Sequence, residues 1–216
     1  MQRSDLSDIE YHSLLERVLP IIMERGLKGT TMDIVAARLG MSKRTLYELF
    51  PSKSEMIKEA LNAHGKQSHQ FISDTFANAE NVMVALIEIF KYNRDLMKIV
   101  NVEFYKDMDR LYKASRADYE KTRESRNEKM HQIFSLGVEQ GMFRPDVDFK
   151  IQNNIMALQM EGLKRMEDHF PPEITIQRVF DAIIVGFLRS IASEKGMKIL
   201  DNLTKELIEK DYYIKE

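Results

Sequence analysis

The sequence predicts an all-α fold of about nine or ten helices. Apolar residues recur at intervals of three and four along most of the chain, the spacing of an amphipathic helix, and strict alternation hardly occurs. The 216 residues include nine Gly and five Pro, a low share that favours helices over turn-rich β structure. A composition of 44% hydrophobic and 31% charged residues is typical of a soluble globular protein with a sizeable core.

A first helix is expected over residues 8–25. An apolar stripe at helical spacing gives it an inward face, made of Leu14, Leu15, Val18, Leu19 and Ile22. Pro20 lies inside this helix, removes one backbone hydrogen bond and should bend or weaken it. Gly26 and Gly29 then end the helix.

Two short helices joined by a tight turn follow, between residues 31 and 50. The first has a buried stripe made of Met32, Val35, Ala36 and Leu39. Gly40 comes directly after this stripe, where a helix stops and the backbone can need a positive φ. Ser42 is well placed to cap the second helix, in which Leu46 and Leu49 face inward. Two helices of about two turns around a Gly turn match a helix-turn-helix, whose second helix lies in the DNA major groove.

An ordered set of short motifs surrounds this segment. They are Glu24-Arg25-Gly26, Thr30-Thr31-Met32, Ala36-Ala37-Arg38-Leu39-Gly40, Ser42-Lys43, Thr45-Leu46-Tyr47 and Phe50-Pro51-Ser52-Lys53. In this order and spacing, residues 9–64 resemble the DNA-binding region of the TetR family of bacterial transcriptional repressors. The chain departs from the family at Arg44, where a small residue or proline is usual, and at Leu49, where a polar or aromatic residue is usual.

The exposed face of the second short helix supplies the candidate DNA contacts. Lys43 and Arg44 at its amino end can donate to guanine O6 and N7 or bind phosphates, and Tyr47 can donate its hydroxyl to a phosphate. The resemblance implies that Thr31 and Lys53, each near a helix start, grip the DNA backbone on either side. An exposed polar helix without a DNA partner is the alternative. The full candidate set is Thr31, Ser42, Lys43, Arg44, Thr45, Tyr47 and Lys53.

The overall charge gives no sign of a nucleic-acid partner, because the chain has a formal net charge of −2. Charge placement is more informative than this sum. Between residues 40 and 54, Lys43, Arg44 and Lys53 are accompanied by Glu48 as the single acid. A local basic edge on a neutral domain fits a specific repressor better than a protein that coats DNA without regard to sequence.

The remainder of the chain is predicted to be helical. A fourth helix is expected over residues 52–76, and residues 106–129 are dense in mixed charge, which is typical of a solvated helix face. We expect two domains. Residues 1–68 form a three-helix, TetR-type DNA-binding domain with its helix-turn-helix at about 31–50, and residues 69–216 form a larger helical ligand-binding and dimerisation domain.

Two long apolar helices are expected over residues 149–166 and 174–193, with Gly196 ending the second and a short helix over 198–210. Each long helix has two apolar faces, whereas a surface helix needs one. The simplest second partner is the same helix pair of another subunit, although both faces could be covered within one chain. The candidate dimer contacts are Ile155, Leu158, Gly162, Val179, Ile183, Gly186, Phe187 and Ser190.

The second domain is rich in methionine, whose flexible side chain suits adaptable apolar pockets. Methionines that simply fill a helical core would give the same pattern. The resemblance implies a small-molecule effector in this domain, and a movement of the fourth helix that changes the distance between recognition helices. The candidate lining residues are Phe90, Met97, Phe104, Met108, Phe134 and Met156.

Signatures of catalysis are absent from the sequence. There is no Gly-rich phosphate loop, no Cys, and no pair of His at a spacing of four that could hold a metal from one helix. We therefore expect no enzyme activity, no metal and no cofactor. The chain has neither a signal peptide nor an apolar run of 18 residues, so we expect a protein of the bacterial cytoplasm with no membrane contact.

Three classes of function remain, in order. The first is a homodimeric repressor that binds a double-stranded DNA operator and is released by a small, largely apolar effector. The second is a helical DNA-binding protein without such an effector, controlled by a partner protein. The third is an α-helical enzyme. An apolar cavity with a few convergent polar groups would favour the first.

Overall fold

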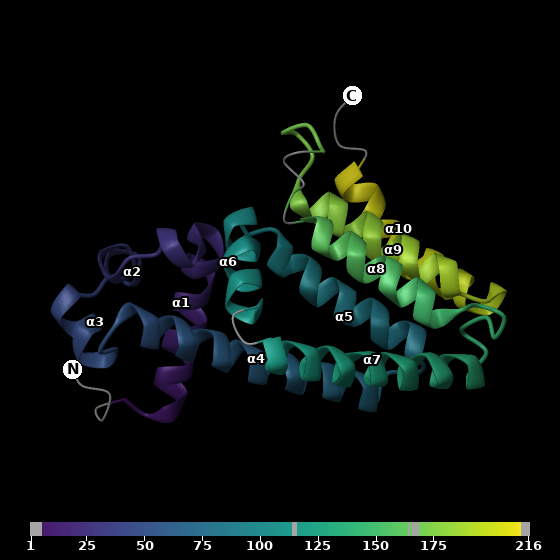
Figure 1. The fold of residues 1–216 in the computed structure, drawn as a ribbon, viewed down its shortest axis with the longest axis horizontal. Coiled ribbons are helices and arrows are strands. Elements are labelled where there is room, and N and C mark those ends of the chain that lie inside the picture. Colours follow the sequence, from purple (N-terminus) through teal and green to yellow (C-terminus); the bar gives the residue numbers. More distant parts are fainter. Residues whose placement is uncertain (1–5, 114–115, 164, 166–168, 213–216) are drawn as a thin grey trace. The chain divides into compact units, whose positions relative to one another are not determined.

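The computed structural model describes residues 6–113, 116–163, 165 and 169–212. In these residues the chain forms ten helices and no strand, apart from one isolated bridge between Phe143 and Ala192 (Figure 1). The predicted all-α class and helix count are confirmed. No helix in this part of the chain is long and apolar enough to cross a membrane.

The chain divides into two compact units, which we call the N-terminal unit and the C-terminal unit. The N-terminal unit contains residues 1–71 and 99–114, and the C-terminal unit contains residues 72–98 and 115–216. The inclusion of residues 99–114 in the first unit does not follow from the sequence pattern. The expected domain boundary at residue 68 stays a prediction.

The N-terminal unit is built from α1 (Asp8–Gly29), α2 (Met32–Leu39), α3 (Lys43–Leu49), the first part of α4 (Lys53–Asn78) and α6 (Val102–Lys113). Helix α1 begins at a capping box, in which Ser7 and Glu10 satisfy each other's backbone amides. The apolar stripe expected on α1 is buried. Helix α1 packs against α2, the first helix of the helix-turn-helix, and α6 packs along α1 as well.

The interruption of α1 lies at Gly26, not at Pro20. Helical torsion angles continue through Pro20, whereas Gly26 has φ 72° and ψ 167°. Pro20 is exposed, so the carbonyl that loses its hydrogen-bond donor there can be hydrated. The helix therefore continues through Pro20 and is interrupted at Gly26, and the expected bending or weakening at Pro20 stays a prediction.

The C-terminal unit contains α5 (Val82–Met97), α7 (Arg116–Glu139), α8 (Phe149–Gly162), α9 (Ile176–Ile191) and α10 (Glu194–Tyr212). Helices α8, α9 and α10 run alongside one another, and α5 packs against α9 and α10 (Figure 1). Phe134 stacks between Phe143 and Phe149, with ring centroids 5.8 Å and 4.3 Å away. The predicted helix 149–166 ends at Gly162, and Met166, expected within it, lies outside the described residues.

Gly196 does not end a helix, which corrects the sequence interpretation. Helix α9 ends at Ile191 and α10 begins three residues later, so Gly196 lies in the first turn of α10. A Cβ atom on this glycine would lie 2.2 Å from the carbonyl oxygen of Met142. The glycine is therefore needed for close packing of two backbones rather than for a helix stop.

Candidate nucleic-acid interface

Helix α3 presents the candidate DNA contacts on a helix that is capped as predicted. The hydroxyl of Ser42 accepts a hydrogen bond from the backbone N–H of Thr45 at 3.0 Å. Leu46 and Leu49 are buried, while the side chains at Lys43, Arg44 and Tyr47 are exposed. The helix thus has one face in the core and one face carrying two cations and a phenol.

The turn before α3 has the geometry that its glycine predicts. Gly40 adopts the left-handed conformation, with φ 70° and ψ 29°. The N–H of Gly40 donates to the carbonyl of Ala37 at 3.2 Å, and the N–H of Met41 donates to that of Ala36 at 3.0 Å. This pair of bonds is a Schellman motif, which satisfies the last carbonyls of α2. It fixes the direction in which the chain enters α3.

Contacts from α1 and α4 hold the two short helices in place. Phe50 is fully buried, and its ring lies 5.7 Å from that of Tyr11 in α1. The Tyr11 hydroxyl donates to Glu59 of α4 at 2.5 Å, and Arg17 of α1 donates to the carbonyl of Leu39 at 3.1 Å. The exposed face of α3 is therefore carried by a rigid scaffold, which reduces the ordering cost of binding.

Both cations of α3 are paired with carboxylates. The ammonium of Lys43 lies 2.7 Å from Asp33 of α2, and this hydrogen bond and charge raise the pKa of Lys43. The guanidinium of Arg44, a side chain 89% exposed, lies 3.0 Å from Glu48. Exposed pairs of this kind contribute about 0–1 kcal/mol, so a phosphate can replace either carboxylate at little cost.

Thr31 and Lys53 lie at the two helix starts where the sequence predicts them. The hydroxyl of Thr31 caps α2 by accepting from the N–H of Ile34 at 3.2 Å. The ammonium of Lys53 donates to the carbonyl of Lys28 at 3.2 Å, which ties the start of α4 to the end of α1. These partners do not follow from the sequence pattern. The Arg44–Glu48 spacing of four was a local signal, but Asp33 and Lys28 carried none.

The expected ligand residues fall into three places. Phe90 belongs to one apolar cluster of the C-terminal unit, and Met97 and Met156 pack against it. Phe134 belongs to a second cluster of the same unit, which Met156 also touches. Phe104 and Met108 lie on α6, in the N-terminal unit. Four of the six residues therefore belong to the C-terminal unit and two to the N-terminal unit, and the role of all six stays a prediction.

The expected dimer residues divide between exposed and buried positions. On α8, Ile155 and Leu158 are exposed, Leu158 to 70%, and Gly162 is exposed beside them. On α9, Gly186 is exposed, and a Cβ added there would meet nothing within 4 Å. Ile183 and Phe187 are instead buried in the clusters of their own chain. Val179 and Ser190 are half-buried.

A cavity of about 330 Å³ opens between α1 and α4 in the N-terminal unit. Leu15, Leu19 and Ala60 supply apolar wall, and burial lowers the pKa of the half-buried His64 beside them. None of the expected ligand residues lines it. Among the described residues, no three His, Asp or Glu side chains are grouped to hold a metal.

Comparisons with known proteins agree with this geometry. Residues 15–60 match the family model for bacterial regulatory proteins, tetR family. The chain is 31% identical over 144 residues to the HTH-type transcriptional repressor KstR2 of Mycobacterium tuberculosis, which covers 62% of this chain and 70% of that protein. It is 36% identical over 63 residues to the DNA-binding transcriptional repressor TetR of Mycobacteroides abscessus, which covers 29% of this chain and 33% of that one.

Solved structures share the fold. The ketosteroid transcriptional regulator KstR2 of M. tuberculosis has a TM-score of 0.59 at 24% identity, covering 88% of this chain and 98% of that chain. A transcriptional regulator from Saccharomonospora viridis in complex with choline has a TM-score of 0.61 at 17% identity, covering 87% and 100%. These relatives are regulators rather than enzymes, as the sequence predicts. The chain belongs to the TetR family of bacterial transcriptional regulators, whose members bind DNA operators and act as dimers.

Proposed function

We propose that this protein is a cytoplasmic, homodimeric repressor that binds a near-palindromic operator and is released by a small, largely apolar ligand. The observation that carries the proposal is the exposed face of α3, where Lys43, Arg44 and Tyr47 stand on a capped and scaffolded helix. Two such helices related by a two-fold axis would read half-sites whose centres are about 34–36 Å apart, or a multiple of one DNA turn.

The test begins with the operator itself. Genomic DNA fragments retained by the full-length protein are sequenced, and the enriched site is labelled for fluorescence anisotropy. A half-site repeated in inverted orientation supports recognition of the operator by a dimer. Retention of fragments with no shared site would mean that the protein is not a sequence-specific repressor.

Lys43→Ala and Tyr47→Ala are each expected to weaken operator binding without unfolding the protein. A lost base contact costs about 1–3 kcal/mol and relaxes the preference at one position, whereas a lost phosphate contact weakens all sequences and lowers the salt slope by about one. Anisotropy titrations at several salt concentrations distinguish the two roles. Unchanged operator binding in both variants would mean that α3 does not contact the DNA.

Asp33→Asn is a matched variant that is expected to change operator affinity in the opposite direction. It removes the carboxylate that holds the Lys43 ammonium at 2.7 Å and leaves the lysine itself intact. If Lys43 contacts DNA, its release should strengthen binding by about 0.2–1 kcal/mol, the range of an exposed ion pair. Weaker binding by Asp33→Asn would instead mean that the pair holds Lys43 in its productive position.

The α8–α9 surface is the proposed contact with a second copy. Apolar side chains at Ile155 and Leu158 are exposed on α8, and small residues at Ala182 and Gly186 are exposed on the neighbouring α9. An exposed row of small residues allows helices to approach closely, and exposed leucine and isoleucine favour burial against a partner. An isologous four-helix contact would use both features.

Gly186→Phe is expected to convert the dimer to monomer or to make it insoluble, and to weaken operator binding. A Cβ at this position meets nothing within 4 Å in the single chain, so the added side chain starts from open space and is expected to obstruct a second copy. Sedimentation and anisotropy measure the two effects. Gly65→Phe on α4, where the space is equally open, is the control and should stay dimeric. A Gly186→Phe protein that is dimeric and binds the operator with normal affinity would mean that the dimer interface lies elsewhere.

The proposed ligand region lies around Phe90, Met97 and Met156 of the C-terminal unit. Two half-buried methionines against an apolar cluster form an adaptable wall, and the buried Arg94 lies three residues before Met97 on α5. The fold relatives named above include a ketosteroid regulator and a choline complex, and a fatty acid metabolism regulator of Clostridium perfringens has a TM-score of 0.51 at 20% identity.

A ligand can release the operator only if it binds the DNA-incompetent arrangement more tightly. A steroid, a long-chain fatty acid and choline are therefore added in turn to the labelled operator complex. Release by one apolar probe, blocked by a bulky Met156→Trp change that leaves operator binding intact, would support this region. Release by choline alone would contradict a largely apolar ligand.

A further inference from the structure

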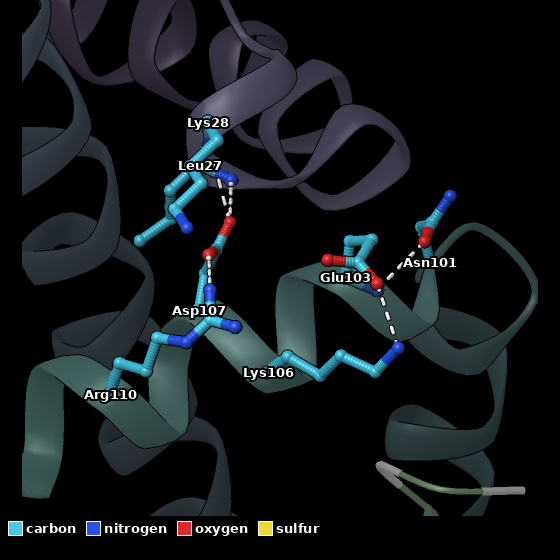
Figure 2. A network of polar contacts seen from close by, with 7 residues as sticks. All are labelled: Leu27, Lys28, Asn101, Glu103, Lys106, Asp107 and Arg110. Atoms are coloured by element: carbon cyan, nitrogen blue, oxygen red, sulfur yellow. Dashed lines mark hydrogen bonds and ion pairs between the residues drawn. The ribbon is translucent and has the colours of Figure 1, made fainter.

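The end of α1 is joined to α6 by a buried carboxylate (Figure 2). Asp107 is 5% exposed, and its Oδ2 accepts hydrogen bonds from the backbone N–H groups of Leu27 at 2.9 Å and Lys28 at 3.2 Å. Its Oδ1 accepts from Arg110 on the same helix at 3.2 Å. The carboxylate therefore has partners on both oxygens, and two of them belong to α1, 80 and 79 positions earlier in the chain.

Gly26 makes this contact possible. Its torsion angles, φ 72° and ψ 167°, lie in a region that residues with a Cβ rarely adopt. The break stops the hydrogen-bond ladder of α1 and restarts the helical turn, which frees the N–H groups of Leu27 and Lys28 at a new amino end. A Cβ on Gly26 would also lie 3.3 Å from the Asp107 carboxylate. The glycine and the aspartate thus form one joint.

This joint lies directly next to two of the proposed DNA contacts. The carbonyl of Lys28 accepts from the ammonium of Lys53 at 3.2 Å, so the same residue bonds Asp107 through its N–H and Lys53 through its C=O. Two residues further on, the fully buried Thr30 donates from its hydroxyl to the carbonyl of Gly26 at 2.7 Å. Thr31, the cap of α2, follows immediately.

We propose that Asp107 is a positioning residue for operator binding: from α6, it fixes the turn 26–30 and through it the phosphate contacts of Thr31 and Lys53. The inference rests on the proposed function for its DNA consequence. Asp107 itself is buried, so its carboxylate is not presented to a DNA surface. Its effect on DNA must therefore pass through the turn that it holds.

Three variants test the joint in the full-length protein. Asp107→Ala removes both acceptors, and Asp107→Asn keeps the size and one acceptor oxygen. Glu103→Ala is the matched control, since it removes a carboxylate of the same helix whose ion pair is with Lys106, at 2.8 Å. Amide hydrogen exchange in the free protein is expected to rise at Leu27 and Lys28 in Asp107→Ala, to rise less in Asp107→Asn, and to stay unchanged in Glu103→Ala.

The salt dependence of operator binding is a measurement that a general loss of stability would not change. Asp107→Ala and Lys53→Ala should each lower the salt slope by about one, because a phosphate contact is lost in both variants. A protein carrying both Asp107→Ala and Lys53→Ala should bind the operator no more weakly than the weaker-binding single variant, since both changes act on one contact. Loss of folded protein alone would lower the active fraction and leave the slope at its wild-type value.

Each result has a definite reading. Unchanged exchange at Leu27 and Lys28 in Asp107→Ala, additive losses in the double variant, or an unchanged salt slope would overturn the proposal. An Asp107→Asn protein as impaired as Asp107→Ala would also overturn it, because the effect would then follow charge rather than the hydrogen bonds. Failure of the wild-type protein to bind any operator would refute the proposed function, and the exchange measurement would still decide whether Asp107 holds the turn.

Discussion

Arg94→Ala is expected to lower the free energy of unfolding of the C-terminal unit by about 3–5 kcal/mol. Arg94 of α5 and Asp181 of α9 are 5% and 2% exposed, and the guanidinium Nε lies 3.0 Å and 2.9 Å from the two carboxylate oxygens. With its amide oxygen turned towards the guanidinium, Gln177 accepts from it at 3.2 Å and 2.9 Å. Removing the arginine would leave a buried carboxylate without its counter-charge, which is the costly half of a broken pair.

An exposed pair in the same unit provides the control. Arg189 of α9 and Asp201 of α10 lie 2.8 Å apart, and their side chains are 53% and 52% exposed. Arg189→Ala should therefore cost less than about 1 kcal/mol. Urea unfolding of the two variants measures the difference. If Arg94→Ala were no more destabilising than Arg189→Ala, the buried pair would not hold α5 to α9. Replacing both Arg94 and Asp181 by apolar residues would then also carry no penalty in stability.

The helix-turn-helix is the part of the structure that the sequence predicted best, because its signals are local. Gly40 is needed for a left-handed turn, and Ser42 caps the helix that follows it. The buried and exposed faces of α3 follow from the spacing of Leu46 and Leu49 against Lys43 and Tyr47. Torsion angles, caps and helical periodicity all depend on residues within four positions of one another.

Features that depend on distant residues were not predictable in the same way. Asp107 and Arg94 find their partners 80 and 87 positions away, and a single sequence carries no signal for such pairs. Helical spacing also predicts that a face is buried without saying by what. On α9 the candidate dimer contacts included Ile183 and Phe187, which the chain's own core covers, as well as Gly186, which is exposed.

Glycine was the residue most easily misread. A glycine after an apolar stripe predicts a helix end, which is correct for Gly40 and wrong for Gly196. The sequence could not distinguish the two because the need for Gly196 comes from Met142, which lies 54 positions earlier in the chain. Pro20 was placed inside the helix by the sequence, and the helix continues through it.

Gly196→Ala is expected to destabilise the C-terminal unit by about 3 kcal/mol, the upper end of the usual cost of overpacking. The added Cβ would lie 2.2 Å from the carbonyl oxygen of Met142. That oxygen is held in place, because it accepts from the N–H of Ser193 at 2.9 Å and the neighbouring Arg144 N–H donates to Ile191 at 2.9 Å. Since the obstructing atom is backbone, neither rotamer changes nor side-chain shifts can relieve the clash.

The helical preference of alanine would not offset this clash. An alanine gains about 1 kcal/mol over glycine inside a helix, which is the expected sign at Gly65 on α4, where an added Cβ meets nothing within 4 Å. Gly65→Ala is thus the matched control, with a small gain in stability against a large loss for Gly196→Ala. Thermal and urea unfolding of both proteins measure the contrast. Equal stabilisation by the two changes would mean that α10 can move away from the 141–143 segment, and that the close contact at its first turn is not required for the fold.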